Sequence, residues 1–92
     1  MQYEGNDKQG EQGEPKSVYV ARISHMLPQV ISKEIERQFL LSHMTIGIQD
    51  HDSHWRCHAL REECVRRGNW GLHYSAVRRA KRIIRSVQKI FQ

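Results

Sequence analysis

Residues 75–91 read SAVRRAKRIIRSVQKIF and carry the clearest periodicity in the chain. Their apolar side chains recur at alternating intervals of three and four residues, which is the pattern of an amphipathic α-helix with one wide buried face. The stretch therefore predicts a helix that packs against the rest of a globular domain. The predicted core face consists of Val77, Ala80, Ile84, Val87 and Phe91, with Ala76, Ile83 and Ile90 beside it.

The opposite side of this predicted helix is basic. We call its four cations the basic stripe: Arg78, Arg82, Arg85 and Lys89. They recur at intervals of four, three and four residues, so they lie within about 60° of one another around the helix axis. Arg79 and Lys81 flank the stripe, and no acidic residue occurs after Glu63.

Charge is distributed unevenly along the 92 residues. Residues 1–54 hold five basic and eight acidic side chains, whereas residues 55–92 hold ten basic and two acidic ones, a net charge of +8. This asymmetry favours a polyanionic partner, most often nucleic acid, because arginines at one-turn spacing can follow phosphates. An acidic protein surface and a merely solvated helix face are the alternatives.

Two further helices are predicted upstream. A helix over residues 28–43 begins at Pro28, which suits the first helical position because it needs no N–H there. A helix over residues 52–67 ends before Gly68 and Asn69, which both tolerate left-handed backbone. The apolar positions that fall on helix faces in these segments are Ile31, Ile35, Phe39, Cys57, Leu60 and Cys64.

The first part of the chain predicts no helix. Residues 1–16 are rich in Gly, Gln and Glu, and we expect a disordered tail there, followed by a single domain over residues 17–92. Residues 18–23 are β-branched and aromatic and predict a short strand or extended segment, and residues 45–48 are the other strand-like stretch. A short two-stranded ribbon beside the three helices is therefore left open.

The second and third predicted helices fit a helix-turn-helix in part. Gly68 would lie in the turn, with Tyr74 and Val77 in apolar positions and the side chains after Tyr74 facing the major groove. However, Glu63 and Arg67 occupy places that this motif normally fills with apolar side chains. An ordinary helical hairpin is the favoured interpretation.

The histidines and cysteines form no recognised metal or catalytic motif. His51, His54 and His58 share one helix face, but there is no Cys-x-x-Cys pair and no metalloprotease pattern, so no metal site is predicted. Cys57 and Cys64 lie two helical turns, about 10 Å, apart, which is too far for a disulfide and predicts reduced thiols in the cytoplasm. Without a phosphate loop or a nucleophile motif, we expect neither enzymatic activity nor a cofactor.

Trp70 is the aromatic side chain of most interest, because it lies in the predicted turn over residues 68–71 between two basic helices. In that position it could stack on a base or enter a partner's pocket. The favoured interpretation is that it folds back to close the hairpin.

These features together predict a small, soluble regulatory protein with no membrane-spanning or secretory segment. Its expected function is binding to DNA or RNA through the arginine-rich face of the C-terminal helix. The alternative is a non-enzymatic adaptor or inhibitor that docks on an acidic surface of a larger protein, such as a phage- or plasmid-borne modulator of a host complex. The predicted binding residues are Arg78, Arg79, Arg82, Arg85, Lys89 and Trp70.

Overall fold

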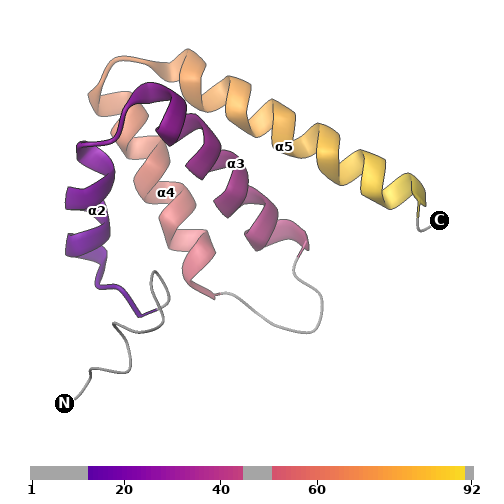
Figure 1. The fold of residues 1–92 in the computed structure, drawn as a ribbon, viewed down its shortest axis with the longest axis horizontal. Coiled ribbons are helices and arrows are strands. Elements are labelled where there is room, and N and C mark those ends of the chain that lie inside the picture. The colour runs from indigo at the N-terminus through magenta and orange to yellow at the C-terminus, as the bar shows by residue number, and fades with distance from the viewer. Residues whose placement is uncertain (1–12, 45–50, 91–92) are drawn as a thin grey trace.

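The computed structural model of the chain describes residues 13–44 and 51–90 (Figure 1). This part of the chain is helical and holds no strand. Viewed down the shortest axis, the helices lie side by side in the order α2, α4, α3, α5, and the body measures 45 × 36 × 16 Å. The helices are α2 (Lys16–Ser24), α3 (Pro28–Met44), α4 (His51–Arg66) and α5 (Trp70–Ile90).

Helix α2 replaces the strand that was predicted over residues 18–23, so that prediction is wrong. Tyr19 and Ile23 lie one helical turn apart and are both fully buried, whereas Val18 and Val20 are exposed. Burial of one helix face therefore overrides the weak preference of β-branched residues for strands. The predicted ribbon loses one of its strands, and residues 45–48 lie outside the described residues.

The N-terminal boundary also differs from the prediction. Residues 1–12 lie outside the described residues, but Lys16, assigned to the predicted tail, begins α2. Glu14 accepts two hydrogen bonds from Arg22, at 3.1 and 3.0 Å. Helix α2 and its contact with Glu14 therefore include residues that the sequence analysis assigned to the tail.

Helices α3 and α4 confirm the two upstream predictions to within one residue at each end. Helix α5 begins at Trp70, five residues earlier than predicted. Gly68 ends α4 with a φ of 70°, and the side-chain oxygen of Asn69 then accepts a hydrogen bond from the backbone N–H of Leu72 at 3.2 Å. Asn69 is thus an N-cap for α5 as well as part of the stop signal for α4.

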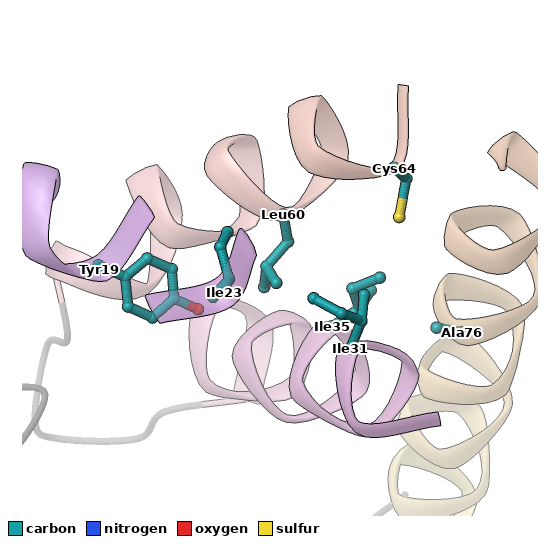
Figure 2. Packing of buried hydrophobic residues seen from close by; sticks show 7 residues of the cluster. All are labelled: Tyr19, Ile23, Ile31, Ile35, Leu60, Cys64 and Ala76. Atoms are coloured by element: carbon teal, nitrogen blue, oxygen red, sulfur yellow. The ribbon is translucent and has the colours of Figure 1, made fainter. Parts of the chain in front are cut away.

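The apolar core lies where all four helices meet (Figure 2). It is small. From α5 it includes the fully buried Ala76, while Leu72 and Val77 are partly buried against it and Ala80 is buried nearby. The core residues drawn in Figure 2 are Tyr19, Ile23, Ile31, Ile35, Leu60, Cys64 and Ala76.

Much of the predicted core face of α5 is not in the core. Ile84 and Val87 are only partly buried, Ile83 is 38% exposed and Ile90 is 76% exposed. The C-terminal end of α5 extends away from the other helices (Figure 1), which agrees with the exposure of Ile90. Phe91 lies outside the described residues.

A buried polar network joins α2, α3 and α4. The hydroxyl of Tyr19 donates to Glu34 at 2.9 Å, and the amide of Gln38 donates to the same carboxylate oxygen at 3.0 Å. Arg56, fully buried on α4, donates to the side-chain oxygen of Gln38 at 3.3 Å. Burial and the nearby Glu34 charge raise the pKa of Tyr19 well above its ordinary value, so this hydroxyl stays protonated and continues to donate.

A second polar link fixes the junction between α4 and α5. The guanidinium of Arg67 donates to the backbone oxygens of Ile23 and Met26, at 3.0 and 2.8 Å, and to the Glu63 carboxylate at 2.6 Å. Arg66 also binds this buried carboxylate. Burial alone would raise the pKa of Glu63, but hydrogen bonds and charge from Arg67 and Arg66 hold it below its ordinary value.

The two glycines near this junction offer a matched test of backbone geometry. A Cβ added at Gly68 or at Gly71 would meet no atom within 4 Å, but only Gly68 has a left-handed φ. We expect Gly68→Ala to lower the free energy of unfolding by about 1 kcal/mol and Gly71→Ala, within α5, to raise it by about 0.5 kcal/mol. Urea denaturation measures both. Equal effects of the two substitutions would contradict the helix boundary.

Glu63→Gln tests the second polar link. Removing the buried carboxylate should lower the free energy of unfolding by about 2 kcal/mol at neutral pH, because both arginines lose a charged acceptor. The folded-state pKa of Glu63 lies below the unfolded value, so its contribution is present above the unfolded pKa, about 4.3, and is lost as the pH falls through the folded pKa. Denaturation curves should therefore show the difference between the two proteins shrinking below about pH 4.

Candidate polyanion-binding face

The basic stripe lies on the solvent side of α5. Arg78, Arg82, Arg85 and Lys89 are all exposed. The helical period places them opposite Ala76 and Ala80, the two positions through which α5 is buried. Among the described residues, no carboxylate forms an ion pair with any of the four.

Arg79 does not belong to this free surface, although it was predicted as a binding residue. Its guanidinium donates to Glu36 on α3 at 3.4 Å and also contacts the hydroxyl of Ser32. It lies about 90° from the centre of the stripe around the helix, and its guanidinium reaches α3 while 42% of its side chain stays exposed. Arg79 therefore joins α5 to α3.

Trp70 lies in the first turn of α5, not in a loop as predicted. Its side chain is 48% exposed, its ring lies 5.0 Å from the ring of His73, and the guanidinium of Arg61 on α4 lies 5.5 Å from the ring centre. Trp70 therefore contacts α4 through Arg61 while half of its surface stays accessible.

Tyr74 is a candidate binding residue that is absent from the predicted binding residues. It is 56% exposed, and Arg78, one turn further along α5, lies over its ring at 5.6 Å. Because α5 begins early, Tyr74 follows Trp70 at a spacing of four residues on an exposed side of the helix. The spacing of four residues from Tyr74 to Arg78 could have indicated that the two side chains share a helix face. The prediction missed it because it began the helix at residue 75, after Tyr74.

The helix-turn-helix register is wrong at Tyr74, which that register requires to be buried. Glu63 and Arg67 occupy positions that the motif normally fills with apolar side chains. In the structure they bind each other, and Arg67 also donates to the backbone oxygen of Met26. Cys64 on α4 belongs to the buried core, Cys57 on the same helix is partly buried, and both thiols are free. Burial raises the pKa of each thiol, so neither is an activated nucleophile.

The histidines of α4 do not assemble a metal centre within residues 13–44 and 51–90. The rings of His54 and His58 lie 5.3 Å apart, edge to face. No group of three or more His, Cys, Asp or Glu side chains in these ranges could hold an ion. The side chain of His51 lies outside the described residues.

Comparison with known proteins adds no assignment. No protein-family model, curated protein or solved structure matches this chain. None of the helices in the described part is both long enough and apolar enough to cross a membrane.

Substitutions of Arg79, which contacts α3, and of Arg82, which is exposed, should differ in their effect on stability. Arg79→Ala should lower the free energy of unfolding by about 0.5–1 kcal/mol, because a half-exposed ion pair to Glu36 and a contact with the Ser32 hydroxyl are lost. Arg82→Ala, at an exposed position with no described partner, should change it by less than about 0.5 kcal/mol. Thermal denaturation of the two variants measures the difference, and a larger loss for Arg82→Ala would refute the orientation of α5.

Proposed function

We propose that this protein is a small, non-enzymatic regulatory protein that binds nucleic acid through the exposed face of α5. The observation that carries the proposal is that the basic stripe is exposed and that no described carboxylate forms an ion pair with it. Four cations extend along one side of a 21-residue helix, and the described carboxylates neutralise none of them. Such a row binds phosphates with release of condensed counterions, which supplies affinity without sequence specificity.

The aromatic residues at the start of α5 support the same proposal. Trp70 and Tyr74 are each about half exposed and lie at the N-terminal end of the helix, next to the stripe. Exposed aromatic rings beside arginines are suited to stacking on unpaired bases, and each stacked base contributes about 1–3 kcal/mol. Single-stranded DNA or RNA therefore fits this surface better than a closed duplex.

A second candidate is docking on an acidic protein surface, and a different observation favours it. Ile83 and Ile90 lie on exposed parts of α5 and have no use in phosphate binding. A partner with an apolar groove and an acidic rim would contact both these side chains and the basic stripe. Ile90→Ser distinguishes the candidates, because it should weaken protein docking and leave nucleic-acid affinity unchanged.

We also propose a reducing compartment, the cytoplasm, as the place of action. Cys57 and Cys64 lie on one helix at a spacing of seven residues, and both are free thiols. This arrangement needs no oxidising environment for folding.

Arg85→Gln should weaken binding to a labelled single-stranded oligonucleotide by about three- to tenfold at low salt, and should lower the slope of log affinity against log salt by about 0.7. Fluorescence anisotropy over a salt series measures both quantities. Lys33→Gln on α3 is the matched control, since it also removes one exposed charge. A similar loss for both variants would indicate attraction by net charge alone and would contradict a binding face on α5.

A further inference from the structure

A separate cleft of about 360 Å³ opens between α3, α4 and α5. Its walls include apolar groups from each helix, namely Phe39, Cys57 and Val77. None of the described residues that line it carries a carboxylate. The charged or protonatable nitrogen groups in its walls are His43, His54, His58, Arg61, His73 and Lys81.

Two of these groups carry a permanent positive charge at neutral pH. Arg61 comes from α4 and Lys81 from α5, so the two fixed charges approach the cleft from different helices. The guanidinium of Arg61 lies 5.5 Å from the ring centre of Trp70, which restrains its position. An anion in the cleft would therefore meet a restrained arginine and a flexible lysine.

Imidazoles from all three helices surround the same space. His54 and His58 are neighbours on α4, His43 lies near the end of α3, and His73 lines the cleft from α5. The His43 ring is stacked on Phe39 at 4.1 Å, and its Nδ1 lies 2.8 Å from the hydroxyl of Ser42. Cys57 is the other titratable group in the walls, and burial keeps it as a neutral thiol.

The surroundings of His73 agree with a positive electrostatic potential in the cleft. Burial lowers the pKa of His73, and the charge of Arg61 lowers it further. An imidazole with these neighbours is protonated more easily once an anion offsets the arginine charge. The cleft thus brings cationic groups together, and none of its described lining residues is a carboxylate that could balance their charge.

We infer that this cleft is a binding site for a phosphate-type dianion, held by Arg61, Lys81 and the surrounding imidazoles, and that affinity rises as the pH falls. The sign follows from proton uptake, because each imidazole that becomes charged adds attraction for the anion. The site goes beyond the proposed function, since it uses no residue of the basic stripe. The dianion belongs either to a small phosphorylated molecule or to the terminal phosphate of a bound nucleic acid, because an internal phosphodiester carries only one negative charge.

Sulfate is the best probe, because its charge does not change between pH 6 and pH 8 and the pH dependence then reports on the protein alone. In a titration followed by NMR, the imidazole C–H resonances of His54, His58 and His73 should shift and saturate. The dissociation constant should be at least about tenfold lower at pH 6 than at pH 8. Sodium chloride at the same ionic strength should not reproduce these shifts.

Arg61→Gln and Arg85→Gln form a matched pair, because each removes one exposed arginine. Arg61→Gln should weaken sulfate binding at least about tenfold at both pH values, and Arg85→Gln should leave it unchanged. Far-UV circular dichroism verifies that both variants keep their helices. Linear, unsaturated shifts, equal shifts with chloride, or equal losses in the two variants would overturn the inference.

A parallel measurement with a 5′-phosphorylated oligonucleotide identifies the source of the dianion. If Arg61→Gln also weakens oligonucleotide binding, the site accepts a nucleic-acid phosphate. If oligonucleotide binding is unaffected while sulfate binding is lost, the site accepts a free phosphorylated molecule. The proposed function fails instead when Arg85→Gln leaves oligonucleotide affinity unchanged, and sulfate binding in the cleft does not depend on that result.

Discussion

Helix α5 is fully buried at two alanines, Ala76 and Ala80, with Leu72 and Val77 partly buried beside them, and this packed side fixes how the whole helix is rotated about its axis. Small side chains allow the helix to approach α3 closely, and the helical period then determines the direction of every other residue. The basic stripe faces solvent, Arg79 faces Glu36 on α3, and the side containing His73 and Lys81 faces the cleft. The separate surfaces of α5 are therefore consequences of one packing contact.

The body that carries α5 depends on polar links as much as on apolar burial. With an extent of 16 Å along its shortest axis, the flat arrangement leaves little room for a core. Gln38, Arg56 and Glu63 are nonetheless buried, and each has partners on neighbouring helices or turns. Buried polar groups are costly when unpaired, so each paired group disfavours other helix registers. The links of Arg67 in particular place the start of α5 against the turn between α2 and α3.

The two proposed anion sites differ in chemistry although they share α5. Arginines dominate the stripe, so its charge is constant over the physiological pH range and its interactions weaken with salt. The cleft combines two fixed charges with imidazoles and partly apolar walls, so its charge changes with pH. Lys81 lies between the stripe and the cleft around the helix. A ligand that reached both sites would couple the response to salt with the response to pH.

The amino-acid sequence by itself determined the mainly helical class, the bounds of α3 and α4, and the alignment of the four stripe cations, because these properties depend on local spacing. It did not determine the state of residues 18–23, since β-branched residues become helical when Tyr19 and Ile23 are buried by other helices. It also did not distinguish Arg79 from its neighbours, because Glu36 and Ser32 are more than forty positions away. Only the tertiary structure brought histidines from α3, α4 and α5 around one cleft. Local spacing fixes which residues share a helix face, whereas packing between distant segments decides what that face meets.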